Sequence, residues 1–269
     1  MESADLDNRL DWRSLYRVAG VAAFVSAALI FVAGAVFMTW PPPGFEPTAA
    51  NTREWFAFFE AHRLAGIFNL DLVMVVDSVL AVPLFLALFL ALRRVSPSWV
   101  TLGLAAALVG TAGYFAINPA FSMLTLSDQY AVAANEAERA AALAAGQTAL
   151  AIYKGTGFDL YILLVSTGGA ILSAAMLRSK LFGKVAGSCG VLANVLNPGM
   201  FLPVVGFAIG FIALLPLVVW YVLVGRALLT LGREGTAGSR TTGRVTQEVV
   251  SPTAPTRSFV HSSQVGPAR

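Results

Sequence analysis

Long apolar runs, separated by short polar stretches, recur along most of the chain. Six of them are long enough to cross a hydrocarbon layer of about 30 Å as a helix, at about 1.5 Å per residue. A helix satisfies its own backbone hydrogen bonds, as lipid requires, so the pattern predicts an all-α transmembrane bundle of six helices. The predicted spans are Val18–Met38, Leu64–Leu92, Trp99–Ile117, Ala151–Leu177, Val185–Leu202 and Phe207–Leu231.

A small-residue turn opens the first, third and fifth of these runs, at Gly20, Gly103 and Gly187. Recurrence at a fixed period is typical of internal repeats, so we expect three tandem helical hairpins. The alternative is that lipid-facing segments share a composition without sharing a repeat. Short matches near the far ends favour the repeat: Pro83 precedes Arg93 by the same interval as Pro216 precedes Arg226.

The remaining segments divide the chain further. Residues 1–17 are expected to be a cytoplasmic segment, and residues 18–231 the transmembrane domain. Amphipathic or alanine-rich stretches near 51–62 and 128–146 predict helices at the outer interface, the second opening at Ser127-Asp128 and ending at Gly146. They could brace the outer bundle or act as a ligand lid, and a brace is the commoner role. The polar, basic composition of residues 232–269 is typical of a disordered cytoplasmic tail.

Composition and charge add a location. Hydrophobic residues make up 57% and charged residues 12% of the chain, too little polar surface for a soluble globule of 269 residues. Lys and Arg beside the predicted helix ends gather on one side, which the positive-inside rule assigns to the cytoplasm. We therefore expect a multi-pass protein of the plasma (inner) membrane with both termini cytoplasmic. The cytoplasmic set is Arg9, Arg13, Arg17, Arg93, Arg94, Arg178, Lys180, Lys184, Arg226 and Arg233, against Arg53, Arg63, Arg139 and Lys154 outside.

Three aspartates in the predicted spans are the sharpest candidates for function. A carboxylate at the bilayer centre costs about 2.5 to 3.5 kcal/mol even on lenient insertion scales. Measured from Arg93, Asp77 lies about 24 Å and Asp71 about 33 Å into the bilayer, and Asp159 lies about 28 Å from Arg178. Asp77 is the deepest and so the hardest to explain as a residue that reaches the interface.

Other polar residues lie at comparable depth, and prolines follow two of them. Proline frees a backbone carbonyl, so Asn-Pro pairs at this depth usually mark irregular backbone that lines protein or water. We expect an outward-facing polar pocket with Asp77 at its floor and with Lys154 neutralising Asp71 or Asp159. The further pocket candidates are Asn69, Tyr114, Asn118, Asn194 and Asn197.

A purely structural explanation of the aspartates stays open. Asp71 and Asp159 could cap helices or reach the interface, and Asp77 could fix helix register through an interhelical hydrogen bond. Substituting Asp77 separates the two explanations.

Other chemistry is not readable in the chain. His62 and His261 lack the neighbours of a metal site, and no nucleophile, base and orienting residue share a pattern. Cys189 is the only cysteine, so no intramolecular disulfide can form. We expect no cofactor and no metal. The net charge of +3 follows from the cytoplasmic bias, so we expect no nucleic-acid partner.

Several motifs resemble those of a known family. They are the segments 15–21 (LYRVAGV), 124–130 (LTLSDQY), 136–141 (EAERAA), 155–158 (GTGF) and 176–179 (MLRS). Together they resemble a family of polytopic bacterial membrane proteins known only as a domain of unknown function, over about residues 11–231. The resemblance implies a six-helix plasma-membrane protein of bacterial type, and it supplies no substrate, cofactor or active residue.

Two functions compete at this stage. The first is a small transporter or permeation protein whose pocket takes a cation, a proton or a small cationic solute. The second is a non-transporting sensor or assembly subunit that binds a protein partner or a second copy of itself. A membrane enzyme is the third option, and the missing catalytic pattern disfavours it. The lipid bilayer is the one partner that all three share.

Overall fold

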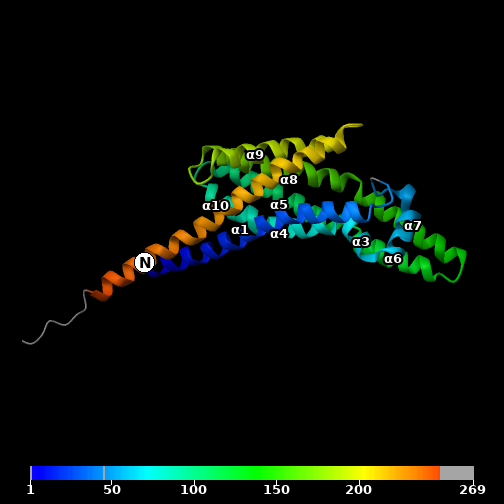
Figure 1. Ribbon diagram of the computed structural model, residues 1–269, viewed down its shortest axis with the longest axis horizontal. Coiled ribbons are helices and arrows are strands. Elements are labelled where there is room, and N and C mark those ends of the chain that lie inside the picture. The colour runs from blue at the N-terminus through cyan, green and yellow to red at the C-terminus, as the bar shows by residue number, and fades with distance from the viewer. Residues whose placement is uncertain (1, 45, 249–269) are drawn as a thin grey trace, which may run out of the picture. The chain divides into compact units, whose positions relative to one another are not determined.

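The computed structural model describes residues 2–44 and 46–248, with side chains for residues 12–44, 46–206 and 208–233. Every regular element in these residues is helical, and no strand occurs among them. The chain separates into two units, residues 1–232 and 233–269, and the first contains all the contacts discussed below. Figure 1 shows its helices as one ribbon coloured along the chain.

Ten α-helices and three short segments of other helix types follow one another. The α-helices are α1 (Glu2–Thr39), α2 (Thr52–Ala61), α3 (Arg63–Ile67), α4 (Val73–Leu92), α5 (Pro97–Ile117), α6 (Ala120–Val132), α7 (Glu136–Tyr153), α8 (Thr156–Arg178), α9 (Lys184–Leu196) and α10 (Gly206–Glu248). The short segments are the 3₁₀ turns η1 (Ala49–Asn51) and η3 (Asn197–Phe201) and the π-helical segment η2 (Phe68–Leu72).

Five helical stretches of the described chain are long and apolar enough to cross a membrane. Large apolar side chains on them face outward rather than into the bundle, including Phe31, Leu102 and Val109. Contact between such a surface and water is unfavourable, whereas contact with the hydrocarbon of a bilayer is not. The fold is thus that of an all-helical membrane protein. The five stretches are Trp12–Thr39, Arg63–Leu92, Pro97–Val132, Glu136–Arg178 and Ala208–Arg233.

The fifth predicted span, Val185–Leu202, is divided. Its first part forms α9, and the 3₁₀ turn η3 then begins at Asn197 with Pro198 in its first turn, so no single helix there reaches the length of the other five. A proline near the start of a helical turn is favourable, but it cannot donate the hydrogen bond that would continue α9. The described residues therefore contain five long apolar helices rather than six.

Close contacts between glycines hold α5 against α8. A side chain on Gly168 would collide with the backbone of Gly103 and of Ala107, and one on Gly110 would meet the Tyr161 carbonyl oxygen at 3.2 Å. Small residues let helix backbones approach this closely in membranes. We call these contacts the glycine interface. The helix pairs α1 with α4 and α8 with α9 also pack side by side.

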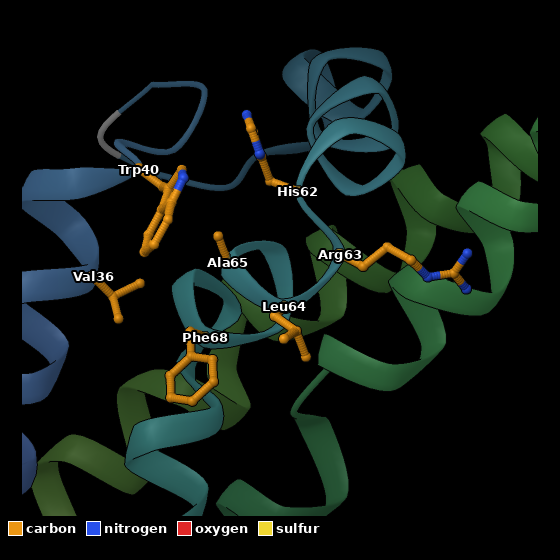
Figure 2. Close-up of a pocket in the computed structure, with 7 residues that line it drawn as sticks. All are labelled: Val36, Trp40, His62, Arg63, Leu64, Ala65 and Phe68. Atoms are coloured by element: carbon orange, nitrogen blue, oxygen red, sulfur yellow. The ribbon is translucent and has the colours of Figure 1, made fainter.

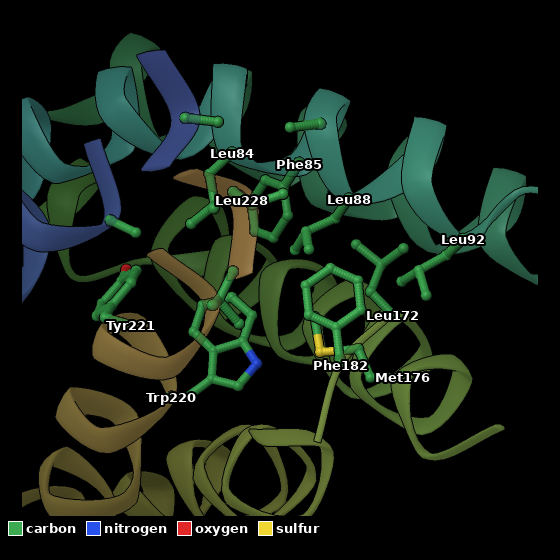
Figure 3. Close-up of a cluster of buried hydrophobic side chains, with 14 of the residues drawn as sticks. Leu84, Phe85, Leu88, Leu92, Leu172, Met176, Phe182, Trp220, Tyr221 and Leu228 are labelled. Atoms are coloured by element: carbon green, nitrogen blue, oxygen red, sulfur yellow. The ribbon is translucent and has the colours of Figure 1, made fainter. Parts of the chain in front are cut away.

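One end of the bundle is basic. Arg93 and Arg94 lie close to Tyr16, the Arg17 Nε donates to the Gly232 carbonyl oxygen at 3.2 Å, and Arg178 lines a small cavity beside Ser96. Between this end and the middle of the bundle lies the largest apolar cluster, with Leu84, Leu88, Leu172 and Val224 fully buried (Figure 3).

The opposite end carries α2, α3, α6 and α7, which pack on one another around Trp55, Phe59, Leu70 and Met123 (Figure 1). We call it the capped end. Helix α2 matches the predicted segment 51–62, but the boundaries of the predicted helix 128–146 differ. Ser127 and Asp128 lie inside α6, and the next helix begins at Glu136.

The cause of that later start is the Asn135 side chain. Its Oδ1 accepts a hydrogen bond from the Glu138 backbone N–H at 2.9 Å, while a Glu138 carboxylate oxygen accepts from the Ala134 N–H at 2.9 Å. This reciprocal capping fixes a helix start. Helix α7 continues past Gly146. The missing side chain at Gly146 makes room for Phe56 and Thr52 of α2.

The predicted disordered tail begins inside a helix, since α10 continues to Glu248. Residues 249–269, which complete that prediction, lie outside the described part of the chain.

Candidate functional site

A break in the second membrane stretch forms the first part of the site. Between α3 and α4 the backbone leaves helical geometry at Leu70 and at Asp71, whose φ is +65°. A non-glycine residue in the left-handed region is uncommon, and π-helical segments occur frequently at functional sites. Carbonyl oxygens at the break accept hydrogen bonds from side chains of another helix.

Two side chains from the end of α5 satisfy those carbonyls. The Asn118 Nδ2 donates to the Leu70 carbonyl oxygen at 3.2 Å, and the Tyr114 hydroxyl donates to the Asp71 carbonyl oxygen at 3.5 Å. Asn118 also donates to the Tyr114 hydroxyl at 3.2 Å, which joins the two. The Asn118-Pro119 pair places these groups here, because Pro119 ends α5 and the Asn118 Oδ1 accepts from the Ala120 N–H at 3.1 Å.

A tyrosine from α8 extends the polar groups towards the middle of the bundle. Tyr161 stacks on Tyr114 with ring centroids 4.4 Å apart, and Ser78 of α4 lies near its hydroxyl. Ser78 is the residue that follows Asp77. The glycine interface sets this geometry, since Gly110 lies directly against the Tyr161 backbone.

Asp77 lies where α1, α4 and α10 meet. The Tyr221 hydroxyl donates to both of its carboxylate oxygens, at 3.1 and 3.3 Å, and Ser26 faces the same pair from α1. The Ser26 hydroxyl is buried and makes no hydrogen bond of good geometry. In the described part of the chain no Lys, Arg or His forms an ion pair with Asp77. We call Asp77, Tyr221 and Ser26 the acid interface.

Lys154 lies at the capped end. Its Nζ is 3.9 Å from a Glu46 carboxylate oxygen and 4.8 Å from the centre of the Phe158 ring, and its charge acts on Asp71. It therefore interacts with one of the two aspartates considered from the sequence, without a salt bridge to it. Asp159 is exposed in the first turn of α8, where the helix dipole favours a carboxylate.

The remaining candidate amides hold elements together at separate places. Asn69 donates to the Trp40 carbonyl oxygen at 3.0 Å and so joins α1 to the broken helix. Asn194 donates to the Gly190 carbonyl oxygen at 2.7 Å and lies against Gly169 of α8. Asn197 donates to the Ser166 hydroxyl at 3.0 Å. Asn194 and Asn197 thus lie between α8 and α9, away from the break at Asp71.

Two cavities lie elsewhere and are lined mainly by apolar atoms. The larger, about 480 Å³, lies between the end of α1 and α3, with Val36, Trp40, Ala65 and Phe68 directed towards it (Figure 2). Arg63 at its margin turns away to α6, where it pairs with Asp128 at 2.6 Å. The smaller, about 330 Å³, lies between α5 and α8 at the basic end. None of the three candidate aspartates lines either cavity.

Four residues of the site were not among the sequence candidates: Ser26, Ser78, Tyr161 and Tyr221. Serines and tyrosines are ordinary in membrane helices, so none differs from its neighbours by composition. Only tertiary contacts single them out, because each lies beside an aspartate or another site tyrosine. Among the described residues no group of three His, Cys, Asp or Glu side chains could hold a metal ion.

No protein family, curated protein or solved structure matches this chain.

Proposed function

We propose that this protein is a small transporter or permeation protein in which Asp77 binds a proton or a small cation. One observation carries the proposal: the Asp77 carboxyl group lies among membrane-spanning helices with a phenol as its partner and no cationic side chain among the described residues. Burying an isolated carboxylate costs much more than burying one that is paired. A bound proton or cation removes that cost.

The broken helix beside Asp71 supports the proposal. Transporters commonly bind ligands where spanning helices are interrupted, because the freed carbonyls and helix ends coordinate ions. Here the break lies towards the capped end, and Tyr114 and Tyr161 connect it to the region of Asp77. A ligand that enters from the capped end would meet polar groups along this line.

Six crossings with both termini in the cytoplasm fit the same proposal. The 18 residues of α9 and η3 rise about 30 Å, at about 1.5 Å per α-helical and 2.0 Å per 3₁₀ residue. They run along α8, from Gly187 beside Leu177 to Asn197 beside Ser166. The divided segment is thus long enough to act as the sixth crossing. The basic end, with Arg17, Arg93, Arg94 and Arg178, would then face the cytoplasm of a bacterial plasma membrane.

The test is flux into liposomes that contain the purified protein. Proton uptake is followed with a trapped pH-sensitive dye under a potassium diffusion potential, and radiolabelled sodium and methylammonium are measured in parallel. We expect flux of at least one probe, and we expect Asp77→Asn to lower it at least tenfold. Removing the charge while keeping the shape eliminates the binding group.

Asp159→Asn is the matched control, because Asp159 is also a membrane-helix aspartate but is exposed at the start of α8. Its flux should stay within twofold of the unmodified protein. Flux of all three probes that is equal in empty and loaded liposomes, or that survives in Asp77→Asn, would overturn the proposal.

The capped end favours a second candidate, a non-transporting assembly subunit. It has an apolar core of its own around Trp55, Phe59 and Met123, so it is a preformed surface for a protein partner. In that function Asp77 would only hold helices in register. Photo-crosslinking from Glu54 and Arg139 in cells would recover one stable partner, and Asp77→Asn would leave the partner bound.

A further inference from the structure

Buried polar atoms without hydrogen bonds gather at one turn of α10. The described residues contain four such side-chain atoms, in Ser26, Trp55, Ser173 and Trp220. All but the Trp55 atom lie at or beside the turn that carries Trp220 and Tyr221. Ser26 faces Tyr221, and Ser173 lies beside Trp220. Buried polar groups are nearly always paired in proteins, so a cluster of exceptions requires an explanation.

Ser173 and Trp220 meet at Gly190 of α9. A side chain on Gly190 would collide with both the Ser173 hydroxyl and the Trp220 indole nitrogen. Ser173 is 0% and Trp220 3% exposed, so neither reaches solvent or lipid. The Ser173 hydroxyl and the Trp220 indole nitrogen therefore both point at Gly190, and this direct contact leaves no room for water. We call these three residues the glycine gate.

The glycine gate and the acid interface are on two sides of α10. Trp220 and Tyr221 are consecutive, with ring centroids 5.2 Å apart. Figure 3 shows the Tyr221 hydroxyl pointing towards α1, while the indole nitrogen of Trp220 faces the side where Leu172 and Phe182 lie. Ser173 lies about 8 Å from Arg178 along α8, at about 1.5 Å per residue, so the gate is towards the basic end.

One end of this turn of α10 can bend, and the other end is held against α1. Pro216 lies one turn before Trp220 and leaves the Ile212 carbonyl without its helical donor, which permits bending. Beyond Tyr221, Gly225 touches Gly20 of α1, with the Gly20 carbonyl oxygen 3.0 Å from where a Gly225 side chain would begin. The segment between Pro216 and Gly225 can therefore bend at Pro216 while Gly225 stays in contact with α1.

Resting on the proposed transport function, we infer that Ser173, Gly190 and Trp220 form the closed inward gate of the pathway. When α10 moves away from α9, water reaches both polar atoms. The indole N–H then donates to a water oxygen, and the serine hydroxyl both donates and accepts. Both groups gain the partners that the closed state denies them, which favours opening. A proton or small cation released from Asp77 reaches this water past the adjacent Tyr221 and Trp220 rings, whose centroids are 5.2 Å apart.

Three variants test the gate by the flux assay described above. Gly190→Ala fills the contact and prevents water from entering, so flux should fall at least tenfold. Ser173→Ala removes the hydroxyl at nearly constant shape, and Trp220→Phe removes the indole nitrogen together with part of the ring, so flux should fall about three- to tenfold in each. Ser173→Ala should not lower the melting temperature, because the hydroxyl that it removes makes no hydrogen bond in the closed state.

Gly187→Ala is the matched control for Gly190→Ala. Gly187 lies one turn earlier on α9 and is also tightly packed, but against the Leu177 side chain. Its flux should stay within twofold of the unmodified protein. Unchanged flux in folded Gly190→Ala, or equal losses in Gly187→Ala, would overturn the gate.

Cysteine labelling tests the gate without measuring transport. Cys189→Ala removes the single native thiol, and Ser173→Cys then reports water at the gate. A membrane-impermeant maleimide should label this cysteine from the basic side, faster when a proton gradient is imposed. No labelling from that side would overturn the gate even if Asp77-dependent flux were found. Labelling without any Asp77-dependent flux would instead count against the proposed function alone.

Discussion

The glycine interface and the acid interface are two kinds of helix contact in one bundle. In the first, α5 and α8 touch backbone to backbone through Gly103, Gly110 and Gly168. In the second, α1, α4 and α10 meet around a carboxyl group, a phenol and a serine hydroxyl that makes no hydrogen bond. Many weak dispersion attractions stabilise the glycine interface. The acid interface depends on a few polar groups whose hydrogen-bond partners can change.

The two interfaces therefore have different roles: the glycine interface holds its helices in place, and the acid interface can rearrange. Backbone contact tolerates almost no displacement, since packed interiors lose attraction steeply over fractions of an ångström. A phenol beside a carboxyl group can turn to water or to a ligand and keep a hydrogen bond. We therefore expect α5 and α8 to stay fixed while α10 moves, with Tyr161 held by the first contact and directed towards the second.

The largest effect should come from breaking the glycine interface. Gly168→Leu forces a bulky side chain against the backbone of Gly103, and overpacking of this kind costs about 3 kcal/mol. The folded yield and the melting temperature in detergent, followed by size-exclusion chromatography after heating, should both fall. Gly113→Leu is the control, because among the described residues nothing but the adjoining backbone of α5 lies within 4 Å of where a Gly113 side chain would begin. Similar losses in both variants would show that leucine itself, and not the contact, is responsible.

Breaking the acid interface should cost less and should depend on its partner. Tyr221→Phe leaves the Asp77 carboxyl group without its donor, at a cost of about 1 to 3 kcal/mol. In an Asp77→Leu background the same change should be neutral or stabilising, because the phenol has already lost its acceptor. Melting temperatures of the four proteins measure this coupling. Equal effects of Tyr221→Phe in both backgrounds would contradict the hydrogen bond.

A single hydrogen bond between η3 and α8 gives an intermediate effect. Asn197→Ala removes the donor to Ser166 and should cost about 1 kcal/mol, since a net hydrogen bond contributes roughly that much. Thermal unfolding of Asn197→Ala beside Asn197→Asp, which keeps the size but not the amide donor, measures it. An unchanged melting temperature in both variants would mean that η3 adds nothing to the packing of α8.

The smallest effect should come from a charge pair outside both interfaces. Arg63 and Asp128 approach to 2.6 Å, but their side chains are 57% and 49% exposed. Exposed pairs contribute about 0 to 1 kcal/mol and weaken with salt. Arg63→Gln should therefore change the melting temperature only slightly, and the difference should vanish at 1 M salt. A large, salt-independent loss would mean that Arg63 acts through the adjoining cavity and not through its charge.

The apolar stretches were readable from the sequence because lipid imposes one simple rule on length and polarity. Five of the six predicted spans coincide with long apolar helices, and the sixth is divided at Pro198. The helix start at Glu136 was missed because Ser127 and Asn135 are both acceptable caps by type. Only the reciprocal bond with Glu138 decides between them.

Asp77 was identified from its sequence position because an acid in an apolar run is exceptional wherever the chain folds. Its partners were not identifiable, since Ser26 and Tyr221 are far away in sequence and ordinary in type. The predicted pocket also joined residues that the structure separates. Asn118 and Tyr114 belong to the break at Asp71, whereas Asn194 and Asn197 lie between α8 and α9.

By itself, the sequence determined that the chain is a helical membrane protein with an acid in an apolar helix, because transfer from water to hydrocarbon depends on composition along each segment. Tertiary structure alone decided which helices touch, which hydroxyl faces Asp77 and which glycine closes on Ser173 and Trp220. Those contacts depend on the rotation and tilt of each helix about its axis. Many similar small residues compete to set both, and only the packing of the whole bundle chooses among them.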